Sequence, residues 1–233
     1  MNREIVVTQD GSHSISIPGM NITYRSKYGA IQESMHVFIK AGLQYASARM
    51  TAPGPLYIFE MGFGTGLNAL LTAAETERAG LQVYYETVEA FPIDTAQASQ
   101  LNYCGQLQRT DLKPLFEQLH QSEWNKETTL APHFTLRKWL SPLHTWLSGK
   151  TSPATGPGIN IVYYDAFAPE VEPELWTADI FTLLYKLMAP QGVLVSYCSK
   201  TEVRRALQVA GFDVEKIPGP PHKREMLRAI KMG

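Results

Sequence analysis

Short apolar runs, each closed by a glycine, a proline or an acidic residue, alternate with amphipathic segments along most of the chain. The apolar runs are typical of buried strands, and the amphipathic segments are typical of helices. Strands are predicted at 56–59, 81–88, 133–137, 159–164 and 193–198. Helices are predicted at 67–78, 92–100, 139–147, 173–188 and 200–210. Because strands joined by helices form right-handed parallel units, the pattern predicts an α/β layer fold.

The two ends of the chain depart from this alternation. Residues 212–217 and 225–230 are consecutive strands without a helix between them, which predicts a sheet that finishes antiparallel. At the front, short β-type runs precede an amphipathic helix over 29–45. These runs lie at 5–8, 14–17 and 21–24. We therefore expect a small N-terminal unit of strands and helix, residues 1–50, appended to a core domain of residues 51–233.

A glycine-rich turn follows the first core strand, in the pattern Glu60-x-Gly62-x-Gly64-x-Gly66. Glycines let a ligand approach bare backbone, and the helix that starts at about Leu67 points free N–H groups at that ligand. A dinucleotide fingerprint would need a glycine at position 67, and an acid ahead of the glycines would repel a diphosphate. The ammonium and carboxylate of S-adenosylmethionine suit an acid beside a helix N-terminus. The turn therefore favours this cofactor, with a ligand-free βα turn as the alternative.

A second acid follows the second core strand, at Glu89. An acid about 20 residues after such glycines is placed to accept hydrogen bonds from the two hydroxyls of a ribose. Its alternative is an ordinary acid at a strand end. The candidate cofactor-binding residues are Glu60, Gly62, Phe63, Gly64, Gly66, Asn68 and Glu89.

Asp165 ends the fourth core strand and opens the turn Asp165-Ala166-Phe167-Ala168-Pro169. In an open α/β sheet this turn should face the glycine-rich turn across the crevice where the strand order reverses. Asp165 is the candidate catalytic residue, because it can accept a hydrogen bond from an amine. It would either relay the proton of that amine or stabilise the charge that forms. Phe167 can pack against a base and Pro169 fixes the loop; the alternative is a turn in which Asp165 only caps a helix.

The composition excludes several classes of protein. Apolar residues make up 44% of the chain and charged residues 18%, which indicates a globular protein. The net charge of −1 gives no general attraction to nucleic acid, so such contacts need a local basic patch. The six histidines and two cysteines lack metal-ligand spacing, so no metal is expected. No apolar run approaches the roughly 20 residues of a membrane span and no secretory signal opens the chain. We therefore expect a cytoplasmic protein.

Several motifs together resemble the methyltransferase part of the bacterial MnmC family of tRNA 5-methylaminomethyl-2-thiouridine biosynthesis. They lie at 10–12, 28–34, 59–68, 165–169, 173–177, 203–212 and 223–227. The resemblance implies a class I methyltransferase: a Rossmann-like, doubly wound, mostly parallel seven-stranded sheet with an antiparallel last strand. It also implies S-adenosylmethionine as the cofactor. The implied reaction converts 5-aminomethyl-(2-thio)uridine at the tRNA wobble position to its 5-methylaminomethyl form.

The same resemblance implies the partners. The expected partner is the anticodon stem-loop of tRNA, with Arg204, Lys223 and Arg224 as candidate phosphate contacts. Each of these cations has a solvated surface as its alternative. The oxidase domain of bifunctional members has no counterpart in the sequence, so no FAD is expected and a separate enzyme would supply the aminomethyl substrate. Residues 136–139 lack the Gly-Asp-like turn that such enzymes often place near adenine, so no residue is assigned there.

Two other functions stay open at this point. A methyltransferase of the same fold that acts on a small-molecule amine would suit the low net charge. A cofactor-binding module without turnover, or a nicotinamide oxidoreductase, is the third possibility. Leu67 stands where a dinucleotide fingerprint needs its third glycine, which argues against the oxidoreductase.

Overall fold

The computed structural model describes residues 2–50, 54–150 and 158–233, and a sheet of eight strands forms its centre. The strands are β4 (Leu56–Met61), β5 (Val83–Glu89), β6 (Glu127–Ala131), β7 (Phe134–Leu140), β8 (Ile159–Tyr164), β9 (Met188–Ser196), β10 (Phe212–Pro218) and β11 (Glu225–Lys231). Their spatial order is β10-β11-β9-β8-β4-β5-β7-β6. The predicted α/β fold with a mostly parallel sheet is confirmed.

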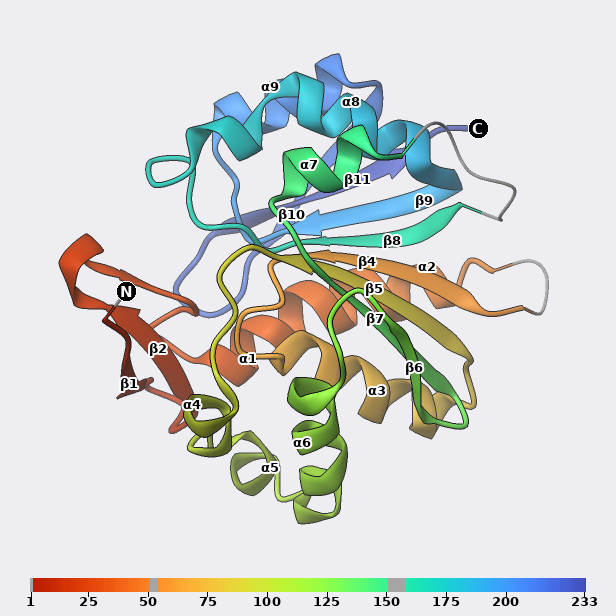
Figure 1. Cartoon of the computed structure of the whole chain (residues 1–233). Coiled ribbons are helices and arrows are strands. Elements are labelled where there is room, and N and C mark those ends of the chain that lie inside the picture. Colours follow the sequence, from red (N-terminus) through yellow and green to blue (C-terminus); the bar gives the residue numbers. More distant parts are fainter. Residues whose placement is uncertain (1, 51–53, 151–157) are drawn as a thin grey trace.

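Helices cover both faces of this sheet (Figure 1). One face carries α3 (Leu67–Ala79) and α6 (Lys113–Gln121), and the other carries α7 (Leu143–Ser148), α8 (Ala178–Leu187) and α9 (Thr201–Val209). Short helices are α4 (Thr95–Ser99), α5 (Tyr103–Gln106), η3 (Thr110–Leu112) and η4 (Pro173–Trp176). Successive side chains of a strand point to opposite faces, so Tyr163 and Tyr164 of β8 enter two different apolar cores.

The sheet has one strand more than the seven that were expected. β11 runs antiparallel to both β9 and β10, as expected of the last strand. The additional strand is β6, which pairs antiparallel with β7 at the opposite edge. The sequence predicts no strand there, because β6 is an edge strand that begins with three polar residues and contains no long apolar run. β7 also extends to Leu140, so the helix predicted from residue 139 begins only at Leu143.

The N-terminal segment combines a small separate sheet with a helix of the main core. β1 (Glu4–Val7), β2 (His13–Ile17) and β3 (Ile22–Thr23) form a three-stranded antiparallel sheet. It lies beside the carboxyl ends of the parallel strands (Figure 1). The predicted helix is a continuous run of α1 (Ala30–Ser34), η2 (Met35–Gln44) and α2 (Tyr45–Ser47), in which η2 is a π-helix.

The side chains of η2 tie this helix to the main sheet. Val37 and Phe38 are fully buried in the same core as Ile58 of β4. The ring of Phe38 lies 5.2 Å from that of Tyr163 in β8. The domain boundary after residue 50 stays a prediction, and residues 51–53 beside it lie outside the described residues.

Candidate active site

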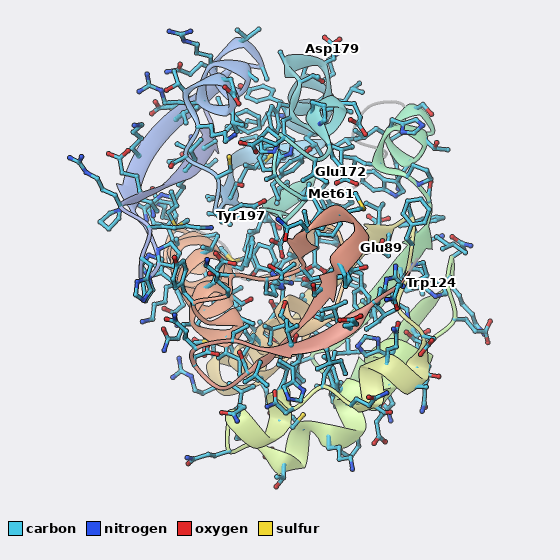
Figure 2. The ribbon with its side chains drawn as sticks, turned by 90° about the vertical axis from the view of Figure 1, so that its left-hand side faces the viewer. Met61, Glu89, Trp124, Glu172, Asp179 and Tyr197 are labelled. Carbon is cyan, nitrogen blue, oxygen red and sulfur yellow. The ribbon has the colours of Figure 1, made fainter. Side chains whose placement is uncertain are left out.

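A pocket of about 410 Å³ lies between the N-terminal sheet and the carboxyl edge of the central sheet. Its walls come from the ends of β4, β5 and β8, from the segment after β7 and from the N-terminal strands. Figure 2 shows the N-terminal strands in front of Met61, Glu89 and Glu172. Ligands of open α/β sheets bind beyond this edge of the sheet, so we treat the pocket as the candidate active site.

The glycine-rich turn between β4 and α3 lines this pocket with backbone. Gly62 and Gly64 have φ angles of +88° and +51°, a region that strongly favours glycine. A Cβ at Gly62 would lie 3.3 Å from the main-chain oxygen of Asp165. A Cβ at Gly64 would lie 3.3 Å from the ring of Tyr24. The turn therefore passes close to both neighbouring walls because these two positions carry no side chain.

Glu89 lies at the end of β5 with its carboxylate against the glycine-rich turn. Its Oε2 accepts a hydrogen bond of 3.0 Å from the backbone N–H of Gly64. Its Oε1 accepts one of 2.9 Å from the backbone N–H of Phe91. Glu89 and the exposed ring of Phe91 both line the pocket. The carboxylate is thus fixed at the strand end where the sequence predicts a contact with ribose.

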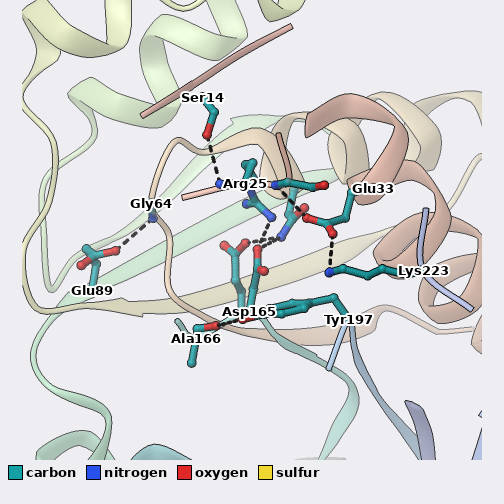
Figure 3. A network of polar contacts seen from close by, with 12 residues as sticks. Ser14, Arg25, Glu33, Gly64, Glu89, Asp165, Ala166, Tyr197 and Lys223 are labelled. Carbon is teal, nitrogen blue, oxygen red and sulfur yellow. Dashed lines mark hydrogen bonds and ion pairs between the residues drawn. The ribbon is translucent and has the colours of Figure 1, made fainter. Parts of the chain in front are cut away.

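Asp165 follows β8 and faces the glycine-rich turn, as the topology predicts. Its side chain is only 6% exposed, and its Oδ2 accepts a hydrogen bond of 2.9 Å from Asn68 Nδ2. The same oxygen forms an ion pair with Nη1 of Arg25 (Figure 3). Burial raises the pKa of Asp165 to about 6, and the guanidinium of Arg25 opposes that rise. Most of the Asp165 carboxyl groups are therefore ionised at neutral pH.

Glu60 and Asn68 lie behind the glycine-rich turn, and their side chains do not line the pocket. Both are fully buried, and Asn68 Nδ2 donates a hydrogen bond of 2.9 Å to Glu60 Oε1. Since the same amide also contacts Asp165, it links the two carboxyl groups. Burial raises the pKa of Glu60 to about 8, so this group is mostly protonated at neutral pH. Asn68 therefore contacts protein carboxyl groups in this structure.

The aromatic residues of the two turns are placed differently. Phe63 is 1% exposed and packs edge-on against the rings of His120 and Trp124, away from the pocket. Phe167 lines the pocket, where its ring lies 5.3 Å from that of Tyr24. Pro169 is buried just beyond it. Of these candidates only Phe167 presents its ring to the pocket.

The candidate phosphate contacts differ in their partners. Lys223 Nζ lies 2.9 Å from Glu33 Oε2 and 4.2 Å from the centre of the Tyr197 ring. Its ammonium is thus already engaged by groups of the protein. Arg224 is exposed and Arg204 is half-buried, and neither forms an ion pair with any residue that the structure describes.

Several pocket residues were missed by the sequence analysis. They are Arg3, Tyr24, Arg25, Phe91, Glu172 and the 141–144 segment. The 141–144 segment follows β7 directly, and it would have been found had the end of that strand been predicted at Leu140. No local signal indicates Arg25, because it reaches the pocket through the packing of a separate sheet. Its ion pair with Asp165 could be recognised only from the tertiary structure.

Within 2–50, 54–150 and 158–233, no group of three or more His, Cys, Asp or Glu side chains is arranged to hold a metal ion. Over the same residues, no helix combines the length and the apolar character needed to cross a bilayer.

Known proteins resemble this chain in sequence and in fold. A family model described as S-adenosyl-L-methionine-dependent methyltransferase matches residues 117–232. The tRNA 5-methylaminomethyl-2-thiouridine biosynthesis bifunctional protein MnmC of Pseudomonas fluorescens (strain Pf0-1) is 32% identical over 226 residues, covering 90% of this chain and 32% of that protein. The corresponding protein of Ectopseudomonas mendocina (strain ymp) is 33% identical over 219 residues, covering 88% of this chain and 31% of that protein. The chain therefore spans about a third of the length of these relatives.

Solved structures agree with these matches. The crystal structure of MnmC2 from Aquifex aeolicus matches with a TM-score of 0.75 and 26% identity, over 99% of this chain and 70% of that chain. A spermidine synthase structure matches over 98% of this chain with a TM-score of 0.53 and 11% identity, a likeness of fold alone.

The α/β fold, the glycine-lined pocket and the family model together define the chain as an S-adenosylmethionine-dependent methyltransferase. Within that class it is homologous to the methyltransferase part of the MnmC family.

Proposed function

We propose that this protein transfers a methyl group from S-adenosylmethionine to the exocyclic amine of 5-aminomethyl-(2-thio)uridine at the tRNA wobble position. The observation that carries the proposal is the contact between Gly62 and the Asp165 turn within one pocket. This contact brings a carboxylate that can bind an amine next to the turn that would hold the cofactor. The MnmC relatives, which are named for tRNA 5-methylaminomethyl-2-thiouridine biosynthesis, support tRNA as the acceptor.

The residues of the pocket fit the proposed cofactor. The bare backbone at Gly62 and Gly64 leaves a cradle that a Cβ would narrow. Each oxygen of Glu89 accepts one backbone N–H bond, so further lone pairs stay available to ribose hydroxyls. The exposed ring of Phe91 beside it offers a flat apolar surface to a base. We assign the turn to the amino-acid end of the cofactor and Glu89 to its ribose.

Asp165 would hold the acceptor amine. Its Oδ2 is already engaged by Arg25 and Asn68, while no described residue donates a hydrogen bond to its Oδ1. Oδ1 can therefore accept an N–H of the amine and aim the nitrogen lone pair at the methyl group. Such positioning contributes about 7–11 kcal/mol in favourable cases. The bound cofactor supplies a methyl group on a good leaving group, so the transfer itself requires neither a metal nor FAD.

The acceptor nucleoside and its tRNA would contact groups around the pocket. Phe167 would pack against the uracil ring, and Pro169 would hold its loop. Arg204 and Arg224 are the proposed phosphate contacts, because neither is engaged by a described carboxylate. Lys223 would contact a phosphate while it remains paired with Glu33. The proposed tRNA substrate favours a reaction in the cytoplasm.

Methyl transfer to tRNA tests the proposal directly. Labelled S-adenosylmethionine would be incubated with the protein and with tRNA that carries 5-aminomethyl-2-thiouridine. We expect label in the wobble nucleoside, and no label when the tRNA already carries the methylated form. Absence of label in the aminomethyl tRNA, under conditions in which the cofactor binds, would contradict the proposal.

A small-molecule amine is the second candidate acceptor. The pairing of Lys223 with Glu33 and of Arg228 with Glu215 favours it, because carboxylates of the protein already engage these two cations. The same labelled assay with free alkyl amines in place of tRNA separates the two. Turnover on the free amine without turnover on tRNA would support this second candidate.

A further inference from the structure

Arg25 reaches the pocket from outside the central domain. It follows β3 of the N-terminal sheet, and its backbone N–H donates a hydrogen bond of 3.0 Å to the buried hydroxyl of Ser14. Its carbonyl oxygen accepts one of 2.8 Å from Thr23 Oγ1. The residue as a whole is only 4% exposed. These two hydrogen bonds fix the backbone of Arg25 to the small sheet.

The guanidinium of Arg25 ends at Asp165, which lies 140 residues further along the chain. The two side chains are 3% and 6% exposed, so the pair is almost shielded from water. Burial tends to lower the pKa of the Arg25 guanidinium, but the carboxyl groups of Asp165 and Glu60 raise it above its usual value. Arg25 thus stays positively charged beside the proposed catalytic carboxylate.

The groups that face this pair come from every element around it. They are Glu60 of β4, Asn68 of α3, Tyr85 of β5, Tyr103 of α5, Tyr197 directly after β9 and Glu33 of α1. Glu33 is neutralised by its own ion pair with Lys223, as Figure 3 shows. Glu60 shares Asn68 with Asp165, and burial favours its protonated form. Arg25 is therefore left as the principal counter-ion of Asp165.

We propose that Arg25 is a positioning residue for methyl transfer: it keeps the buried Asp165 carboxylate ionised and fixes its Oδ2. Its free Oδ1 then faces the acceptor amine in a defined direction. Without a nearby positive charge, a carboxyl group at this depth would hold its proton and could not accept a hydrogen bond in the same way. The N-terminal sheet thus completes the active site. This inference rests on the proposed function and names a residue that acts through Asp165.

A purely structural role is the competing explanation. In that case the ion pair would only fasten the N-terminal sheet to the core, and the protonation of Asp165 would not matter for turnover. The two explanations differ in the pKa of Asp165 and in the pH profile, which a fastening role would leave unchanged.

Two variants of Arg25 separate charge from geometry. Arg25→Gln removes the charge, so the pKa of Asp165 should rise by about one to three pH units. The acidic limb of the kcat profile should move to higher pH by the same amount, and kcat at pH 7 should fall about twofold for a rise of one unit and about 90-fold for a rise of three. Arg25→Lys keeps a charge but loses the planar fork, so kcat should fall while the pKa of Asp165 stays near its wild-type value. Affinity for S-adenosylmethionine should change less than threefold in both.

The pKa is read by NMR of protein labelled with ¹³C at the aspartate carboxyl carbons, with Asp165→Asn used to assign the signal. Arg49→Gln is the matched control, because Arg49 is exposed and stacks on Tyr45 far from this cluster. In Arg49→Gln, the pKa of Asp165 and kcat should both match those of the wild type. If Arg25→Gln does not fold, Arg25→Lys carries the test through its kcat at constant affinity for the cofactor.

The outcomes are distinct. An unchanged Asp165 titration in folded Arg25→Gln, or wild-type kcat in Arg25→Lys, would overturn the positioning role. A wild-type protein that transfers no methyl group to tRNA would instead contradict the proposed function. The titration would still report whether Arg25 controls Asp165, because it needs no turnover.

Discussion

The main-chain oxygen of Asp165 passes so close to Gly62 that a Cβ on the glycine would lie 3.3 Å from it. This approach follows from the pairing of two parallel strands. Met61 at the end of β4 is the register partner of Tyr164 at the end of β8, and the N–H of Asp165 donates to the carbonyl oxygen of Met61. One residue beyond each strand, the two turns meet. The register of β4 and β8 thus brings the two turns together at the pocket.

Replacing Gly62 by alanine should disturb both turns. The new Cβ would occupy a left-handed φ of +88° and press on the Asp165 backbone. We expect a loss of about 1–3 kcal/mol in folding stability and at least tenfold weaker binding of S-adenosylmethionine. Urea unfolding and calorimetric titration measure the two effects. Gly105→Ala in α5 is the control, because its Cβ would meet no atom within 4 Å and it should bind normally.

Replacing Glu89 by glutamine should weaken cofactor binding more than it slows the chemistry. The amide keeps the shape of the side chain. It loses the negatively charged carboxylate whose oxygens would accept hydrogen bonds from the ribose hydroxyls. We expect the Kd for S-adenosylmethionine to rise about tenfold, since hydrogen bonds to charged groups contribute about 1.5–3 kcal/mol. Glu77→Gln, at a side chain 57% exposed on α3, should bind like the wild type. Equal Kd values for all three proteins would remove Glu89 from the binding site.

Replacing Asp165 by asparagine should slow turnover while the fold and the cofactor affinity persist. The neutral amide cannot take or stabilise a proton from the amine, and such a group contributes about 10²–10⁴-fold to a rate. Single-turnover kinetics with aminomethyl tRNA would measure the loss, and thermal unfolding would check the fold. A wild-type rate would show that Asp165 has no part in the transfer.

Glu60 should make the protein less stable as the pH rises from 6 to 8.5. Burial raises its folded-state pKa to about 8 from an ordinary value of 4.5, so between these values the folded protein binds more protons than the unfolded chain. Stability then falls with rising pH, by at most about 1.4 kcal/mol per pH unit for one proton. Glu60→Gln should flatten this dependence in urea unfolding curves. Parallel curves for the two proteins would mean that Glu60 does not titrate in this range.

Arg224 and Lys223 should affect tRNA binding differently although they are neighbours. Arg224→Gln should weaken binding of tRNA and lower the slope of log K against log salt by about one, the signature of a lost phosphate contact. Lys223→Gln should instead lower stability, because it leaves the buried carboxylate of Glu33 without its ion pair. Filter binding at several salt concentrations and urea unfolding separate the two. Identical salt slopes for Arg224→Gln and the wild type would contradict the phosphate contact.

Much of the fold could be predicted because it depends on local patterns. The apolar runs 56–59 in β4, 161–164 in β8 and 193–195 in β9 are continuous, since helices cover both faces of the sheet there. The edge strand β6 was missed because its exposed polar residues carry no such pattern. The π-helical form of η2 was also beyond the sequence, since its periodicity differs little from that of an α-helix over one segment.

The sequence by itself determined the class of fold, the glycine-rich turn and the acids at the strand ends. Each of these depends on a short stretch of chain: Glu89 and Asp165 both lie directly after a predicted strand. Only the tertiary structure decided which acids reach the pocket, leaving Glu60 behind the turn, and which cation pairs with Asp165. The reason is that Arg25 lies on a separate sheet, 140 residues from its partner. Contacts of that kind arise from the packing of elements and leave no periodic signal in the chain.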